Sequence, residues 1–185
     1  VFALLAEQTR GKIFYCADDP GAVAVCGAHP RAVSYGFADG TRYRCGAVTM
    51  EGMSSRFILW RDGIELGEVE LAVPGRHNVA NATAASAVAL ELGLGFEAVS
   101  SALGSFRGAK RRLEVRYESE SYLVVDDYGH HPTEIRATLA TVRAAGRERV
   151  RVIFQPHRYS RTMALREEFG RAFADADDVW VTGVY

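Results

Sequence analysis

The spacing of hydrophobic and polar residues predicts a helix at 1–10, followed by a segment rich in strands. Short runs in which apolar residues cluster or alternate with polar ones predict strands at 12–16, 31–36, 42–49, 55–60 and 64–73. Asp18-Asp19-Pro20-Gly21 predicts a turn after the first of these strands. Asp62-Gly63, between the last two, predicts a two-residue hairpin.

The pattern becomes helical after residue 74 and then alternates between strands and helices. Ala-rich residues 78–94 and the segment 97–106 predict two helices. Strands are predicted at 113–118, 121–126, 149–154 and 177–182, with helices at 133–145 and 161–174. Such alternation is typical of an α/β fold with a parallel or mixed sheet covered by helices. The polar segment 107–112 separates the two patterns, so we predict domains at 1–108 and 109–185.

Charge and composition exclude several classes of function. The chain has 22 basic and 23 acidic residues, so it has no excess of positive charge that would attract nucleic acid or an anionic membrane surface. No apolar run approaches the roughly 18 residues of a membrane span, and no basic leader is present, which predicts a cytoplasmic protein. Cys16, Cys26 and Cys45 lack metal-site spacing and are interpreted as reduced packing residues. Because the chain opens without Met and closes on a predicted strand, we expect a fragment of a longer protein.

Polar residues that could bind a ligand or act in catalysis follow two neighbouring predicted strands. One turn runs over 126–134, after the strand at 121–126, and the other over 154–161, after the strand at 149–154. Ligands of open α/β sheets bind at the carboxyl ends of strands. The two turns are therefore predicted to present His, Asp and Arg side chains toward one cleft.

The first turn has several possible roles. Asp126 and Asp127 could cap a helix, bind a metal or accept hydrogen bonds from ribose hydroxyls. His130 and His131 are adjacent, so we expect one to be functional and one structural. His131 precedes Pro132, which suits the first helical position, and this assigns His131 to the cap.

The second turn carries His157, Arg158 and Arg161, which would suit a carboxylate or phosphate, although a solvated salt-bridging face is the alternative. The three-residue spacing predicts that the two arginines share a helix face. Lys110-Arg111-Arg112 is either a solvated charge run or a phosphate clamp.

The start of the Ala-rich helix holds another polar group. Asn78 and Asn81 lie three residues apart, and a side-chain amide both donates and accepts, as the edge of adenine requires. The alternative is that Asn78 caps the helix and His77 is a loop residue.

Taken in order, these motifs resemble the Mur ligases of peptidoglycan synthesis, in particular the members that join L-alanine to UDP-N-acetylmuramate. The resemblance rests on residues 74–81, Phe106 with Arg111-Arg112, residues 125–135 and residues 154–162. The resemblance implies that the chain comprises the later part of a central ATP-binding domain, which has a mixed sheet and helices. The first part of a Rossmann-like carboxyl-terminal domain would follow it. The resemblance also implies a cytoplasmic enzyme that uses ATP and Mg²⁺ to form an amide through an acyl phosphate.

The resemblance implies a role for each candidate residue. Residues expected around the nucleotide are His77, Asn78 and Asn81 at the adenine, Arg112 at the phosphates, Asp127 at the ribose, and His130 on the nucleotide side. Residues expected to face muramate and alanine are His157, Arg158 and Arg161, of which His157 and Arg161 are the catalytic candidates. No metal ligand is expected in this chain, because the family's magnesium ligands precede it. The alternative function is a non-catalytic nucleotide-binding or interaction module that keeps only the adenosine contacts.

The sequence lacks both common phosphate-binding motifs, G-x-x-x-x-G-K-[ST] and G-x-G-x-x-G. The resemblance places the phosphate-binding lysine outside these 185 residues. We therefore expect the isolated chain to have no ligase activity and weak or no affinity for ATP.

Overall fold

The computed structural model describes residues 2–146 and 148–185 and divides them into two units. The first unit comprises 2–49, Ser54–Ala72 and Arg76–Phe106. The second comprises Met50–Met53, Val73–Gly75 and the described residues of Arg107–Tyr185. The domain limits 1–108 and 109–185 stay predictions.

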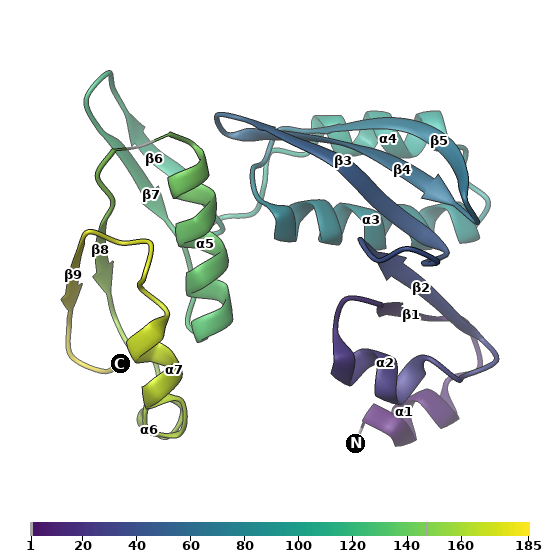
Figure 1. Cartoon of the computed structure of the whole chain (residues 1–185), viewed down its shortest axis with the longest axis horizontal. Coiled ribbons are helices and arrows are strands. Elements are labelled where there is room, and N and C mark those ends of the chain that lie inside the picture. Colours follow the sequence, from purple (N-terminus) through teal and green to yellow (C-terminus); the bar gives the residue numbers. More distant parts are fainter. Residues whose placement is uncertain (1, 147) are drawn as a thin grey trace. The chain divides into compact units, whose positions relative to one another are not determined.

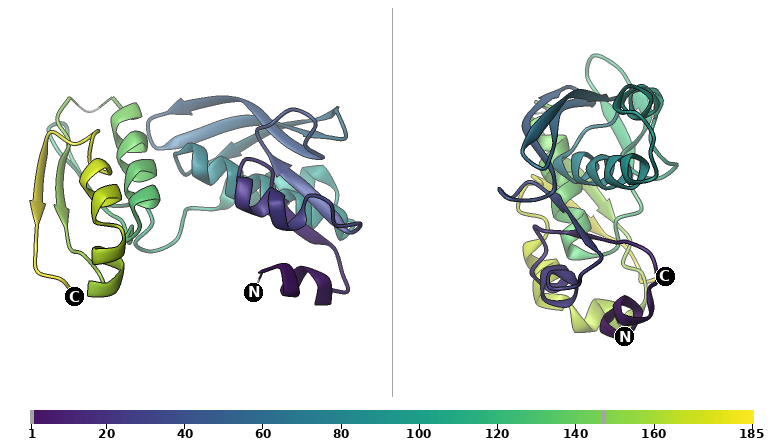
Figure 2. Two further views of the ribbon diagram at one scale, coloured as in Figure 1. Left: turned by 60° about the horizontal axis from the view of Figure 1, so that its bottom comes forward. Right: turned by 90° about the vertical axis from the view of Figure 1, so that its right-hand side faces the viewer.

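The first unit is a five-stranded mixed sheet with helices. Its elements are α1 (Phe2–Gln8), β1 (Ile13–Cys16), α2 (Pro20–Cys26), β2 (Ala32–Gly36), β3 (Tyr43–Glu51), β4 (Ser54–Arg61), β5 (Ile64–Leu71), α3 (Arg76–Glu91) and α4 (Phe96–Ser105). The strand order is β1-β2-β3-β4-β5, with β2 parallel to β1 and β3, and β4 antiparallel to β5. Helix α3 lies along the sheet and packs on β2, and α4 packs on β5 (Figure 1). Helix α2 packs on β1, and α1 packs on α2 (Figure 2).

The core of the first unit follows from strand alternation. In β4, Ser55, Phe57 and Leu59 are buried at every second position, as expected for a strand with one face on the core. Figure 1 shows α3 below this part of the sheet. The helix buries a small face, including Val79 and Ala87, against the sheet, so its Ala-rich sequence permits close packing.

The hairpin predicted at Asp62-Gly63 is confirmed. Both residues have positive φ, 51° and 79°, as a type I′ turn requires, and Arg61 pairs with Ile64 across it. The turn predicted at 18–21 is wrong in part, because α2 begins there. Asp19 is the N-cap and accepts a hydrogen bond from the backbone N–H of Ala22 at 2.7 Å, while Pro20 takes the first helical position. Asp and Pro favour both a turn and a helix start, so these residues do not distinguish the two.

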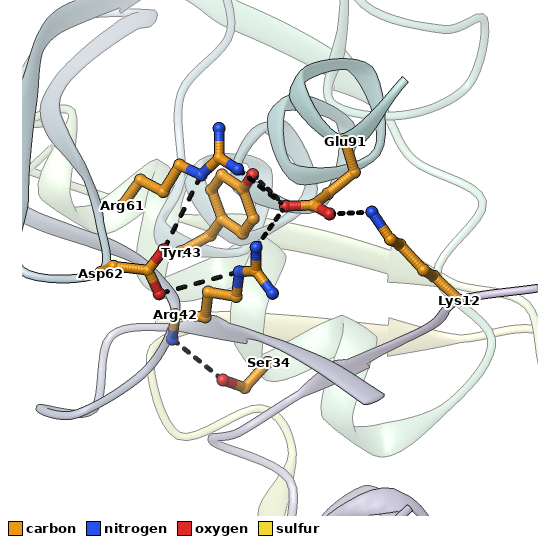
Figure 3. A network of polar contacts seen from close by, with 7 residues as sticks. All are labelled: Lys12, Ser34, Arg42, Tyr43, Arg61, Asp62 and Glu91. Atoms are coloured by element: carbon orange, nitrogen blue, oxygen red, sulfur yellow. Dashed lines mark hydrogen bonds and ion pairs between the residues drawn. The ribbon is translucent and has the colours of Figure 1, made fainter. Parts of the chain in front are cut away.

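A buried carboxylate in the last turn of α3 holds several elements of the first unit together (Figure 3). The Glu91 side chain is only 4% exposed. Its donors are the Tyr43 hydroxyl at 2.7 Å, Arg42 at 3.0 Å, Arg61 at 3.4 Å and the Lys12 ammonium. We call these five residues the Glu91 network. It joins α3 to the residue before β1, to β3 and its preceding residue, and to the end of β4.

The Glu91 network shifts the ionisation of its two acidic members in opposite directions. The hydrogen bond from Lys12, above all, holds the pKa of the Glu91 carboxyl below its usual value, although burial opposes this. Burial, and then the hydrogen bond to Glu91, raises the pKa of Tyr43 to about 12. The folded state therefore favours a charged Glu91 beside a neutral Tyr43.

The second unit is also α/β. Its elements are β6 (Glu114–Glu118), β7 (Leu123–Asp126), α5 (Pro132–Ala144), β8 (Arg151–Phe154), α6 (Tyr159–Ala164), α7 (Arg166–Arg171) and β9 (Asp178–Val181). Strands β6 and β7 are antiparallel, and β8 and β9 are parallel. The core consists of Ile135, Leu139, Val150, Phe154, Phe169 and Ala172. The α/β fold expected from the alternation is confirmed.

The single helix predicted at 161–174 is two short helices. Leu165 separates α6 from α7, with φ −111° and ψ 19°. Its side chain packs against the core cluster of the second unit, so a tertiary contact coincides with the break. No helix in the described part of the chain has the length and hydrophobicity of a membrane span.

Candidate functional site

Asp127 fixes the shape of the turn after β7. One carboxylate oxygen accepts a hydrogen bond from the N–H of Gly129 at 2.7 Å, and the other accepts from the N–H of Leu113 at 2.9 Å. A Cβ on Gly129 would lie 2.7 Å from the Asp127 carboxylate, so a side chain there would displace it. Asp126 instead forms an ion pair with Arg111 at 3.6 Å. Asp127 is thus a structural residue of the turn.

The start of α5 confirms the capping role predicted for His131. Its side chain accepts a hydrogen bond from the N–H of Thr133 at 3.3 Å, and Pro132 occupies the first helical position. Glu134 completes the capping box by accepting from the N–H groups of His130 at 2.9 Å and His131 at 3.1 Å. Burial alone would raise the pKa of Glu134, but these hydrogen bonds and nearby positive charge hold the pKa below its usual value.

The prediction that Arg158 and Arg161 share a helix face is wrong. Arg158 precedes α6 and has φ 68°, a left-handed conformation that a residue with a side chain rarely adopts. Its N–H donates to the carbonyl of Tyr185 at 2.9 Å. Only Arg161 lies within the helix, so the three-residue spacing does not align the two side chains.

Four aromatic rings bring the turns after β7 and β8 together. The ring centroids of His130 and His157 are 6.3 Å apart, and Tyr128 lies 5.1 Å from His130 and 6.5 Å from His157. The ring centroid of Tyr185 lies 5.3 Å from that of His157, with the two planes at 30°. We call Tyr128, His130, His157 and Tyr185 the ring cluster. It joins two of the predicted site residues with two tyrosines that the sequence reasoning did not select.

Basic groups lie at the Tyr128 side of the ring cluster. The guanidinium of Arg111 is 4.8 Å from the centroid of Tyr128 and that of Arg112 is 5.9 Å away, both within range of a cation–π interaction. Arg112 also lies 3.4 Å from a carboxylate oxygen of Glu134. The structure therefore groups Arg112 with His130 and His157. An aromatic residue inside a polar turn, as Tyr128 is, was the available signal for this cluster.

Arg161 has a buried nitrogen that lacks a hydrogen-bond partner among the described residues. The atom is Nη1, and an unpaired buried donor costs about 1–3 kcal/mol, more for a charged group. Protein structures usually satisfy such donors. An oxygen of a carboxylate or phosphate would satisfy this one with a charge-assisted hydrogen bond.

The three candidates for adenine lie in the first unit, at the start of α3. The helix begins at Arg76, so Asn78 lies inside the first turn and does not occupy the cap position that the alternative required. His77 and Asn78 are half-buried and Asn81 is exposed. Arg76 stacks on the Phe37 ring at 3.5 Å and connects this end of the helix to the segment after β2.

Residues 2–146 and 148–185 hold no group of three or more His, Cys, Asp or Glu side chains that could bind a metal ion. Asp126 is paired with Arg111, and the oxygens of Asp127 accept backbone hydrogen bonds. The metal-binding alternative for these two carboxylates therefore has no support in the geometry.

A cavity of about 650 Å³ lies within the second unit. Residues of β7, α5 and β8 line it, among them Leu123, Leu139 and Phe154. Asp127 and Gly129 are also part of its wall, so it extends to the turn at the end of β7.

The chain is similar to known Mur ligases along nearly all of its length. The Mur ligase middle domain matches residues 2–89, and the Mur ligase glutamate ligase domain matches residues 111–184. The UDP-N-acetylmuramate–L-alanine ligase of Geobacter sp. (strain M21) is 46% identical over 156 residues, which cover 84% of this chain and 34% of the relative. The corresponding ligase of Solibacter usitatus is 42% identical over 179 residues, which cover 95% of this chain and 37% of the relative.

Solved structures agree with these matches. The UDP-N-acetylmuramate-alanine ligase of Thermotoga maritima has a TM-score of 0.80 and 31% identity, covering all of this chain and 40% of that one. The folylpolyglutamate synthetase of Lactobacillus casei shares the fold alone, with a TM-score of 0.69 and 18% identity. The chain spans little more than a third of the length of the curated relatives named above. Because two consecutive domains of one family match it, the chain belongs to the Mur ligase family.

Proposed function

We propose that this chain is part of an ATP-dependent ligase that joins the amino group of L-alanine to the carboxylate of UDP-N-acetylmuramate. The observation that carries the proposal is Nη1 of Arg161 in α6, which is buried and has no hydrogen-bond partner among residues 2–146 and 148–185. A guanidinium in this state favours a carboxylate or phosphate oxygen as its partner. The choice of substrates is supported by relatives of this chain that are named UDP-N-acetylmuramate–L-alanine ligases.

Arg161 and His157 are the proposed catalytic residues. ATP, when bound, supplies the phosphoryl group that activates the carboxylate. Arg161 binds an oxygen of the reacting carboxyl group and stabilises the negative charge that develops on it during attack by the amine. His157, whose ring neighbours Tyr128 and Tyr185, orients the amine and can accept its proton. Arg158 neutralises a further carboxylate oxygen of the substrates.

The remaining candidates are proposed to hold the nucleotide. The amides of Asn78 and Asn81, with His77, suit the donor and acceptor edge of adenine. Arg112 would bind phosphate oxygens, and His130 would face the nucleotide. Each carboxylate oxygen of Asp127 keeps a second lone pair besides its backbone hydrogen bond, so Asp127 can still accept from a ribose hydroxyl.

An assay of the complete gene product tests this proposal. Phosphate release should require ATP, UDP-N-acetylmuramate and L-alanine together, with one amide formed for each phosphate released. Release that continues without the amino acid contradicts the ligase assignment. ATP binding without any turnover, in the presence of both other substrates and Mg²⁺, would favour a nucleotide-binding module instead.

The neighbours Asp127 and Asp126 form a matched pair for a second experiment. Asp127→Ala removes the acceptor of two backbone N–H groups and should lower the free energy of unfolding of the chain by about 1–3 kcal/mol. In the complete enzyme it should also raise the KM for ATP. Asp126→Ala removes only a partly exposed ion pair and should cost less than about 1 kcal/mol.

Urea denaturation of the 185-residue chain and ATP titration of the complete enzyme measure the two effects. A lowered stability with an unchanged KM for ATP would leave Asp127 a purely structural residue.

A further inference from the structure

Tyr185 is held opposite His157 by two backbone hydrogen bonds. Its N–H donates to the carbonyl of Pro156 at 2.9 Å, and its carbonyl accepts from the N–H of Arg158 at 2.9 Å. In a parallel β-ladder, a residue forms backbone hydrogen bonds to the residues before and after its partner on the neighbouring strand. Tyr185 has this relation to His157. The side chains of Tyr185 and His157 therefore form a cross-strand pair, and their rings lie 5.3 Å apart at 30°.

A shift of register selects Tyr185 for this position. In the ladder of β8 and β9, Phe154 pairs with Val181, which is 181 − 154 = 27 residues later. Tyr185 follows His157 by 185 − 157 = 28 residues, so the chain after β9 contains one additional residue. Without that shift, Val184 would lie opposite His157. Irregularities of this kind redirect side chains, and they are frequent beside functional sites.

The pairing of Tyr185 with His157 also stabilises the unusual backbone conformation of Arg158. This residue has φ 68° and immediately precedes α6, the helix that carries Arg161. A left-handed conformation at a residue with a side chain persists only when surrounding contacts maintain it. The hydrogen bond from the N–H of Arg158 to the carbonyl of Tyr185 is such a contact.

We propose that Tyr185 is a positioning residue, whose ring fixes the orientation of the His157 imidazole toward the amino-acid substrate. This rests on the proposed ligase function. In the 185-residue chain the Tyr185 side chain contributes little to the core, because the residue is 79% exposed. Its removal should therefore disturb His157 without unfolding the second unit.

The first test is the NMR spectrum of the His157 ring in the 185-residue chain. Tyr185→Leu should move the ring C–H resonances of His157, because the ring current of the neighbouring tyrosine is lost. Tyr185→Phe keeps a ring and should keep most of the shift. Tyr159→Leu is the matched control, since Tyr159 is also exposed, at 71%, and lies in α6. Unchanged His157 resonances in Tyr185→Leu, at an unchanged melting temperature, would overturn the proposal.

The second test is steady-state kinetics of the complete ligase. Tyr185→Leu should raise the KM for L-alanine about tenfold through misorientation of His157, while the KM for ATP stays within about twofold. Tyr185→Phe should restore the KM for L-alanine. An increase confined to the KM for ATP would overturn the assignment to the amino acid. Absence of ligase activity in the unmodified protein contradicts the proposed function itself, whereas the NMR result tests the ring contact independently.

Discussion

Replacing Glu91 by alanine should lower the free energy of unfolding of the first unit by about 1.5–3 kcal/mol. The Glu91 carboxylate is almost fully buried and accepts hydrogen bonds from Tyr43 and Lys12 while facing two guanidinium groups. Its removal leaves three positive charges near one another and the Tyr43 hydroxyl without its acceptor. Asp62 still lies 3.7 Å from Arg42 and 3.8 Å from Arg61, so part of the positive charge keeps a partner. The loss combines several contacts of one carboxylate and therefore exceeds the value of a single ion pair.

The measurement is urea denaturation of the 185-residue chain, followed by the fluorescence of Trp60 in β4. The second tryptophan, Trp180, lies in β9 of the second unit, so a Trp180→Phe background isolates the signal of the first unit. Glu70→Ala is the matched control: it removes an exposed pair with Arg56 at 3.0 Å and should cost less than about 1 kcal/mol. Equal losses in the two variants would show that the Glu91 network contributes no special stability.

A neutral substitution at the same position, Glu91→Gln, has a defined pH dependence. Because the pKa of Glu91 is lower in the folded state, its stabilising effect is present above the unfolded pKa of about 4.3 and is lost as the pH falls through the folded pKa. The pKa of Tyr43 is raised to about 12, so its effect is fully present below about 10 and is lost as the pH rises toward 12. The stability difference between the unmodified chain and Glu91→Gln should thus be largest near neutral pH and shrink in acid. A difference that stays constant down to pH 3 contradicts the charged state assigned to Glu91.

Replacing Arg161 by alanine in the complete ligase should lower kcat/KM for L-alanine by about 10²–10³. The proposed role of Arg161 is to stabilise charge that develops on the reacting carboxyl group, so its loss should raise the barrier more than it weakens ATP binding. Arg161→Lys keeps the charge but not the planar fork of donors, and should recover only part of the activity. Arg166→Ala is the control, since Arg166 is exposed on α7. A larger effect on ATP than on L-alanine would assign Arg161 to the nucleotide.

A stability measurement separates this catalytic role from a structural one. Nη1 of Arg161 is buried without a hydrogen-bond partner among the described residues, so Arg161→Ala relieves an unpaired donor. We expect the second unit to lose no more than about 0.5 kcal/mol, or to gain stability. The fluorescence of Trp180 in a Trp60→Phe background reports on this unit. A loss above about 2 kcal/mol would assign Arg161 to the scaffold.

Local sequence signals predicted the elements whose geometry depends on neighbouring residues. The Asp62-Gly63 hairpin and the capping role of His131 are examples, because each uses bonds between residues at most a few positions apart. Helix α2 and the break between α6 and α7 were missed. In the first case Asp19 and Pro20 suit a turn and a helix equally well. In the second, Leu165 packs into a core that no local window contains.

The sequence by itself determined the α/β alternation, the family resemblance and the two turns that carry the candidate residues. Only the tertiary structure decided which of those residues meet. Glu91 bonds to Lys12 from 79 positions away, and Tyr185 reaches His157 through the ladder of β8 and β9 and one shift of register. Whether the nitrogen of Arg161 finds a partner depends in the same way on distant segments. Such pairings depend on the path of the whole chain through space, whereas turns and caps are encoded in the spacing of a few residues.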